Sequence, residues 1–332
     1  MFRRAERSRP VPCSSDCARR PAPRAPQPPA RRRSASRTRR VAGERSQWAR
    51  VSRERRQRPP TLKFDERAVG RLHYLEARPP ASARPRGALV LLHAFPLSAR
   101  MWEPQFGLAD RGWRIIAPEF AMDAVRLNAT ATTVTMDTYA GEVIDLLDAL
   151  HVEDAVVAGC SMGGYLAFAL YRRAPNYIRG LLLADTRAQA DAPEALQSRK
   201  KMLQLVADKG TPAVVDEMVP KLLGETTRKT RPEVVDRLKS IALSTSADAV
   251  AGMIRALMTR QDAMAVLSSI HFPTLIVVGD EDTLTPPAMS EQMHKAIAGS
   301  ELAVLPKAGH LPNLEDSQNF NEVVARFLDH RI

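Results

Sequence analysis

The sequence predicts an α/β fold, in which a mostly parallel β-sheet has helices on both faces and a helical cap is inserted between two late strands. Three observations lead to this prediction. Short apolar runs alternate with longer amphipathic segments along most of the chain after residue 60, as in parallel sheets. One apolar run ends abruptly at Ser161, between glycines. The block 188–270 has only helical periodicity.

The N-terminal segment differs in composition from the rest of the chain. The 332 residues carry a formal net charge of +12, but residues 1–60 alone contain 19 Arg, 4 acidic residues and nine prolines. The remaining residues contain 30 basic and 33 acidic side chains, so nucleic-acid binding by the folded domain is not expected. Because residues 1–60 cannot bury enough apolar surface to fold, we predict a disordered tail.

Three interpretations of this tail are open. It fits an Arg-rich targeting peptide, a basic arm for nucleic acid or anionic lipid, or translated DNA upstream of the true start. We favour the third, because GC-rich DNA encodes Arg, Pro and Ala, and the segment has no apolar signal core.

The cysteines indicate a reducing environment. Cys13, Cys17 and Cys160 are too few for a disulfide framework and lack the spacing of a zinc site. No apolar run reaches the length needed to cross a bilayer. We therefore expect a cytoplasmic protein without a membrane partner, metal or cofactor, and the sequence does not fix its oligomeric state.

The first half of the folded part is expected to begin at residue 61. Ser98 should cap a helix over 98–109 that Gly112 ends. Apolar inward positions predict an amphipathic helix over 136–150. The expected strands are 62–66 and 69–77 near an edge, then 88–93, 113–117 and 154–161.

The second half continues the alternation on either side of the helical block. Strands are expected at 179–185, 274–279 and 301–305, with helices at 287–298 and 320–330. Residues 61–187 and 271–332 therefore form the predicted core, and the block 188–270 forms a cap over its carboxyl edge.

The cap is expected to contain helices only. Pro212 and Pro232 mark helix starts. Its apolar stripes are interpreted as core, and its basic residues as a solvated face. The expected helices are 195–207, 213–223, 232–243 and 247–258; the stripes are Met202, Leu205 and Val206, and Val214, Met218 and Leu222; the basic residues are Arg199, Lys200, Lys201, Arg228 and Lys229.

Ser161 lies at a predicted strand-to-helix corner. Gly159 and Gly163 flank it, which lets neighbouring backbones approach and the serine adopt a strained conformation. The amide of Met162 would then point at an oxyanion beside the serine oxygen. A bare Gly-x-Ser-x-Gly string is weak evidence, so a base and an acid must also be found.

His310 is the candidate base. It follows the last strand on a Gly-containing loop, at the sheet edge where the serine emerges. Asp282, after the preceding strand, is the candidate acid that orients it; Asp280 and Asp185 are the alternatives. The chain order Ser161, Asp282, His310 is that of one fold in particular.

From about residue 61 onwards the chain resembles the α/β-hydrolase superfamily. The matching motifs are Gly159–Gly164, Gly279–Asp282, Gly309-His310, and His93–Pro96, which is similar to the His-Gly-Phe-Pro oxyanion loop of that family. The resemblance implies oxyanion-hole amides from Phe95 and Met162. It also implies that His93 shapes that loop.

Within the superfamily the chain looks most similar to small-molecule esterases, enol-lactonases and cofactor-free haloperoxidases. Two positions depart from the family pattern. Ala94 stands where a glycine is usual, and residues 118–126 lack the Asp-x-x-Gly-x-Gly turn. A Cβ at position 94 bears on how the loop turns its amide inward.

These features predict a serine hydrolase that cleaves a small carboxylic ester or lactone through an acyl-enzyme on Ser161. Two alternatives stay open. Peroxide in place of water would make the same triad a perhydrolase or haloperoxidase, as Pro96 after the oxyanion residue suggests. A non-catalytic ligand-binding protein on this fold is the alternative from another class.

Overall fold

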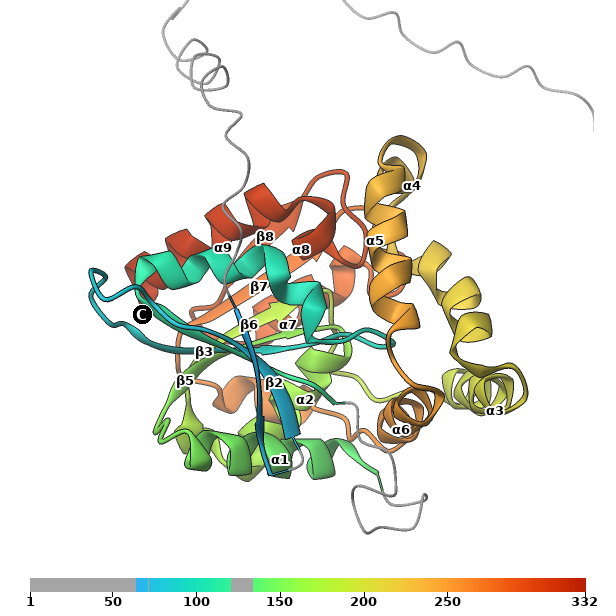
Figure 1. The fold of residues 1–332 in the computed structure, drawn as a ribbon, viewed down its shortest axis with the longest axis horizontal. Helices are drawn as coiled ribbons and strands as arrows, with labels where there is room; N and C mark the ends of the chain where they lie inside the picture. Colours follow the sequence, from blue (N-terminus) through green and yellow to red (C-terminus); the bar gives the residue numbers. More distant parts are fainter. Residues whose placement is uncertain (1–63, 71, 121–133) are drawn as a thin grey trace, which may run out of the picture. The chain divides into compact units, whose positions relative to one another are not determined.

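The computed structural model describes residues 64–70, 72–120 and 134–332, which belong to the compact unit Pro59–Ile332 (Figure 1). The predicted tail 1–60, the start of the first predicted strand and residues 121–126 of the altered loop lie outside the described residues. The strands are β1 Asp65–Val69, β2 Leu72–Ala77, β3 Gly87–Leu92, β4 Trp113–Pro118, β5 Ala155–Cys160, β6 Ile178–Ala184, β7 Thr274–Gly279 and β8 Glu301–Leu305.

The eight strands form one mostly parallel sheet, which confirms the predicted fold class. Their order is β1-β2-β4-β3-β5-β6-β7-β8. Strand β2 pairs antiparallel with β1 and β4, and all other pairs are parallel. The carboxyl ends of β5, β7 and β8 therefore lie at one edge of the sheet. The loops that follow these three strands meet there.

The central strands form the core because they are apolar on both faces. Every residue of β5 and β7 is buried, and only Gly87 of β3 is exposed. The antiparallel edge strand β1 is mostly exposed, as its charged sequence requires.

Helices cover both faces of the sheet (Figure 1). Helices α1 and α2 pack together on one face, and η1 and α9 lie on the other. Thr135 and Thr138 form a reciprocal capping box at the start of α1. The helices outside the cap are η1 Ala99–Arg111, α1 Met136–Ala149, α2 Met162–Arg173, η2 Pro175–Tyr177, α7 Pro287–Ala296, α8 Pro312–Glu315 and α9 Ser317–Arg331.

The segment between β6 and β7 consists of helices and connecting loops without a strand, as predicted for the block 188–270. The two helices expected at 195–207 and 213–223 are present and meet at a non-helical residue, Gly210 (φ 73°, ψ −175°), just before Pro212; the label α3 covers both. The short helix α4 is absent from the sequence prediction. The elements are α3 Pro193–Leu222, α4 Glu225–Thr230, α5 Pro232–Leu243, α6 Ala247–Met258 and η3 Met264–Ser269.

Within residues 64–70, 72–120 and 134–332, no single helix is both long enough and apolar enough to cross a bilayer. The bent pair α5 and α6 is long and apolar enough only when its two members are counted together. Both helices carry buried faces within the cap.

Two local predictions need correction. The segment after Ser98 is a 3-10 helix, and the Ser98 side chain makes no capping hydrogen bond, although Gly112 does end the helix with φ 94°. Pro104 within this helix lacks the N–H that a regular α-helix would use. Val69 belongs to the first strand and pairs with Leu72, since the turn is at Gly70 (φ 56°).

Candidate active site

Ser161 lies in a strained turn between β5 and α2. Its backbone has φ 52° and ψ −111°, a conformation that costs energy for a residue with a Cβ. A Cβ at Gly159 would lie 2.2 Å from the Gly163 carbonyl oxygen, and one at Gly163 would lie 2.0 Å from the Leu92 oxygen. The two flanking glycines are thus required by close backbone packing. They allow the serine side chain to project from the sheet edge.

The structure brings Ser161, His310 and Asp282 into one hydrogen-bonded row. His310 Nε2 is 2.7 Å from Ser161 Oγ, and His310 Nδ1 is 2.8 Å from Asp282 Oδ2. The alternative acid Asp280 is exposed and accepts a hydrogen bond from the Lys307 amide instead. Because Nδ1 faces a carboxylate it carries the proton, which leaves Nε2 free to accept one from the serine.

Asp282 is held by hydrogen bonds within its own loop. The amides of Leu284 and Thr285 donate to Oδ1, at 2.8 and 3.1 Å, and the Thr285 hydroxyl donates to Oδ2 at 2.6 Å. Burial alone would raise the pKa of Asp282, but His310 and these donors lower it to about 2. The carboxylate is therefore ionised at neutral pH. Sequence reasoning missed Thr285, although a threonine three residues after an aspartate is a possible turn signal.

Glu315 supports the loop that carries His310. Its side chain is buried, and Oε1 accepts hydrogen bonds from the amides of Gly309 and Leu311, on either side of the histidine. Oε2 accepts from the amide of Gly224 in the cap at 2.8 Å. One buried carboxylate thus connects the histidine loop to the cap. No sequence motif that we weighed pointed to it.

Asp185, the third candidate acid, lies beside the row without joining it. Its Oδ1 accepts from the Gly279 amide at 2.9 Å, and Oδ2 is buried without a partner among the described residues. Its carboxylate, that of Asp282 and an imidazole nitrogen of His310 lie within 4.8 Å of one another. Two of the three are already hydrogen-bonded to each other. Burial, and then the charge of Asp282, raise the pKa of Asp185 well above its usual range.

We expect Asp185→Asn to become more stable relative to the wild type as the pH rises from about 4 to about 8. Because burial and the charge of Asp282 raise the pKa of Asp185 in the native protein, above about pH 4 the native state binds more protons than the unfolded chain, so wild-type stability falls with rising pH. Asparagine does not titrate and keeps the acceptor for the Gly279 amide. Urea midpoints at both pH values measure the change. A variant-minus-wild-type difference that does not vary with pH would contradict this assignment.

His93 organises the predicted oxyanion loop from beneath. Nδ1 donates to the Ala94 carbonyl at 3.1 Å, and Nε2 accepts from the Phe120 amide at 3.0 Å. Burial lowers the pKa of His93 to about 4, so the ring is neutral and its tautomer is fixed by these two bonds. Ala94 is buried without a positive φ, so its Cβ fits the loop. Phe95 and Met162 line the same cavity as Ser161, where their predicted oxyanion role stays a prediction.

We expect His93→Gln to reduce the loss of unfolding free energy that the wild type shows as the pH falls below about 6.5. Unfolding exposes His93 to an ordinary pKa of about 6.5, so the wild type loses stability as the pH falls from about 6.5 towards 4, by about 3 kcal/mol. Glutamine retains an acceptor for the Phe120 amide but does not titrate. Urea unfolding at pH 7.5 and 4.5 measures the change. His73→Gln, at an exposed position on β2, is the matched control and should behave as the wild type.

A cavity of about 250 Å³ opens beside Ser161. Loops of the core form its floor, and the cap helices α3 and α6 form its walls. The stripe residues Met202, Met218 and Leu222, which we interpreted as plain core, also line this cavity. The full lining is Phe95, Ser161, Met162, Tyr165, Arg187, Asp191, Ala195, Ser198, Arg199, Met202, Met218, Leu222, Leu257, Leu284 and His310.

Four charged residues, the arginine cluster, meet at the wall of this cavity. Arg187, Arg199 and Arg260 all contact Asp191, whose side chain is 1% exposed. The five basic residues of the cap were predicted to lie on a solvated face. This prediction is wrong for Arg199. The other four are exposed: Lys200, Lys201, Arg228 and Lys229. Only the folded cap brings the members of the arginine cluster together, so sequence spacing could not reveal the cluster.

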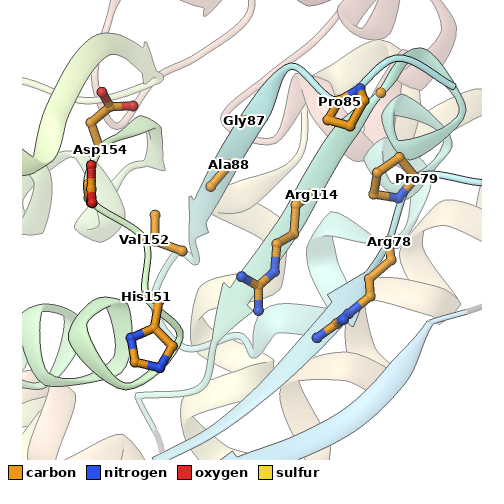
Figure 2. Close-up of a pocket in the computed structure, with 11 residues that line it drawn as sticks. Arg78, Pro79, Pro85, Gly87, Ala88, Arg114, His151, Val152 and Asp154 are labelled. Carbon is orange, nitrogen blue, oxygen red and sulfur yellow. The ribbon is translucent and has the colours of Figure 1, made fainter. Parts of the chain in front are cut away.

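A second cavity, of about 560 Å³, lies at the opposite edge of the sheet, near the starts of β3 and β5 (Figure 2). Arg78 and Arg114 lie on one side of it and His151 and Asp154 on the other. The charges in its lining are mixed, and the described residues that line it include no hydroxyl or thiol nucleophile. The candidate active site is therefore the smaller cavity beside Ser161.

The fold and the site together define a class of protein: a wound parallel sheet that presents a serine, a histidine and an aspartate at one edge, beneath a helical cap. The profile of the alpha/beta hydrolase fold family matches residues 87–317. The chain belongs to this family.

Two curated relatives and one solved structure illustrate the similarity. The chain is 28% identical over 242 residues to 3-oxoadipate enol-lactonase 2 of Acinetobacter baylyi, which covers 72% of this chain and 87% of the relative. It is 30% identical over 196 residues to a pimeloyl-[acyl-carrier protein] methyl ester esterase of Neisseria meningitidis serogroup B, covering 53% and 69%. A malate-bound thermophilic esterase from Thermogutta terrifontis superposes with a TM-score of 0.71 at 29% identity, covering 80% and 98%.

Proposed function

We propose that the protein is a serine hydrolase that cleaves a small carboxylic ester or lactone. The observation that carries the proposal is the 2.7 Å contact between Ser161 Oγ and His310 Nε2, with Asp282 on the other ring nitrogen. A serine hydroxyl becomes a nucleophile when a base lies within hydrogen-bond reach and a third group fixes the base's tautomer. The names of the relatives, an enol-lactonase and two esterases, agree with this chemistry.

In the proposed reaction, His310 takes the hydroxyl proton while Ser161 Oγ attacks the carbonyl carbon. The amides of Phe95 and Met162 bind the oxyanion that forms, and Asp282 stabilises the imidazolium. His310 then returns the proton to the leaving alkoxide, which gives an acyl-enzyme and an alcohol. Water, deprotonated by His310, attacks the acyl-enzyme and releases the acid and the free serine. In a lactone the alcohol and the acid are parts of one product.

Hydrolysis assays with the purified protein test the proposal. We expect turnover of p-nitrophenyl acetate or of a simple δ-lactone, and we expect His310→Ala to reduce kcat by about a thousandfold or more. If neither substrate is hydrolysed faster by the wild type than by His310→Ala, the proposal fails. The predictions of a cytoplasmic location and of no cofactor stay predictions.

A further inference from the structure

The arginine cluster holds more positive than negative charge. Asp191 uses both carboxylate oxygens, since Oδ1 accepts from Arg187 and Arg260, at 2.7 and 2.6 Å, and Oδ2 accepts from Arg199 at 3.3 Å. Burial alone would raise the pKa of Asp191, but Arg199 and Arg260 hold it below its usual value, so the carboxylate is ionised. Three guanidinium charges thus face one carboxylate charge. The cavity lining also contains His310, which is already paired with Asp282, and the phenol of Tyr165, so Asp191 supplies its only carboxylate among the described residues.

Arg187 and Arg199 retain unused hydrogen-bond donors at the cavity. The Nε of Arg187 is buried and has no partner among the described residues. Within the described residues, the one hydrogen bond that Arg199 donates runs from its Nε to Asp191. Both side chains are 20% exposed, and both line the cavity that contains Ser161. A planar guanidinium with free N–H groups is suited to bind a carboxylate in a bidentate manner.

The cluster is fixed in place by packing beneath it. The guanidinium of Arg260 lies 3.9 Å from the centroid of the Tyr165 ring, and its side chain is only 3% exposed. Arg260 therefore anchors Asp191, and Asp191 in turn orients Arg187 and Arg199. A binding group that is held rigidly before the ligand arrives loses little entropy on binding.

Much of the remaining cavity wall is apolar. Met202 lies one turn after Arg199 on α3, and Met218 and Leu257 also line the cavity. The cavity volume of about 250 Å³ is below the range of roughly 300–1,000 Å³ that is typical of pockets for drug-sized ligands. The substrate must therefore be small.

We infer that this site selects small esters or lactones that carry a carboxylate away from the scissile bond, and that Arg187 and Arg199 bind this carboxylate. The inference rests on the proposed function, because it assumes that Ser161 attacks the other end of the same molecule. The carboxylate supplies the negative charge and the acceptors that the cluster lacks.

Two isosteric substrates test the inference. One is the mono-p-nitrophenyl ester of adipic acid, and the other is the corresponding ester of adipamic acid, in which a neutral carboxamide replaces the free carboxylate. We expect kcat/KM of the wild type to favour the carboxylate by about 10- to 100-fold, the effect of a hydrogen bond to a charged group. Equal kcat/KM values for the two esters would overturn the inference while leaving ester hydrolysis established.

A variant pair locates the effect. Arg199→Met should lower the carboxylate-to-carboxamide ratio without abolishing it, because Arg187 remains, and Arg199→Lys should lower it less, since lysine keeps the charge without the planar fork. Lys200→Met, an exposed neighbour on α3 that does not line the cavity, should leave the ratio unchanged. An unchanged ratio in Arg199→Met would remove Arg199 from the proposal.

A test on the wild-type protein avoids any loss of folding in the variants. Adipate should inhibit p-nitrophenyl acetate hydrolysis competitively, whereas adipamide should not, and inorganic phosphate should inhibit less than adipate. Inhibition by phosphate that exceeds inhibition by adipate would overturn the carboxylate assignment. If no ester is hydrolysed at all, the proposed function fails, and calorimetric binding of adipate then tests the anion site separately. Absence of adipate binding in that experiment would overturn the inference as well.

Discussion

Ser161→Ala should reduce kcat for a small ester by on the order of 10⁵-fold or more, because the proposed covalent intermediate forms on its Oγ. The hydroxyl faces His310 Nε2 at 2.7 Å, and alanine leaves the base without a proton to accept. The turn at residue 161 has φ 52°, which both residues adopt with similar strain, so the fold should be retained. Steady-state kinetics measure the loss of kcat, and circular dichroism spectra of both proteins show whether the fold is retained.

Ser240→Ala is the matched control for this change. Ser240 is an exposed serine on α5 and does not line the cavity beside Ser161. Its kcat should stay within about twofold of the wild type, as for most surface substitutions. A Ser161→Ala protein that retains a tenth of the wild-type activity would exclude the acyl-enzyme route.

Asp282→Asn should reduce kcat by on the order of 10⁴-fold through the tautomer of His310. The Oδ1 position already accepts two backbone amides, so the amide oxygen of asparagine will occupy it and the NH₂ will take the place of Oδ2. That NH₂ would then donate to His310 Nδ1, which forces the ring proton onto Nε2. With Nε2 protonated, the ring does not accept the proton of Ser161. KM should change much less than kcat.

Asp280→Asn is the control that separates the two candidate acids. Asp280 lies two residues before Asp282, is exposed, and bonds the Lys307 amide rather than the histidine. Its kcat should fall by no more than a few-fold. If Asp280→Asn were the more damaging change, the acid of the site would have to be reassigned.

Local sequence signals were sufficient for much of the fold and for part of the site. Strands such as β7 are buried on both faces, so their continuous apolar runs are unambiguous, and β7 was predicted at its observed bounds. Ser161 and His310 could be selected because glycines mark both loops and both follow buried strands. The choice among Asp185, Asp280 and Asp282 depended on loop conformation. Spacing alone could not decide it.

Features that depend on several distant segments could not be predicted. Glu315 supports the histidine loop by accepting hydrogen bonds from the amides of residues 224, 309 and 311. These amides lie close together only because the cap packs against the core. Arg199 lies in a helical pattern that predicts a solvent-exposed basic residue. In the structure it instead forms an ion pair with Asp191 in the arginine cluster. For the same reason the apolar stripe at Met202 lines the cavity, where we had expected only core. In each case tertiary contacts overrode a correct local pattern.

The most direct test of the account is to identify the residue that carries the acyl group. Rapid acid quenching of the wild-type protein during p-nitrophenyl acetate turnover, followed by peptide mass mapping, should show an acetyl group on the peptide that contains Ser161. The adduct should decay at the turnover rate and be absent from Ser161→Ala. Sustained turnover with no acetyl group on Ser161, or with the label on another residue, would contradict the account.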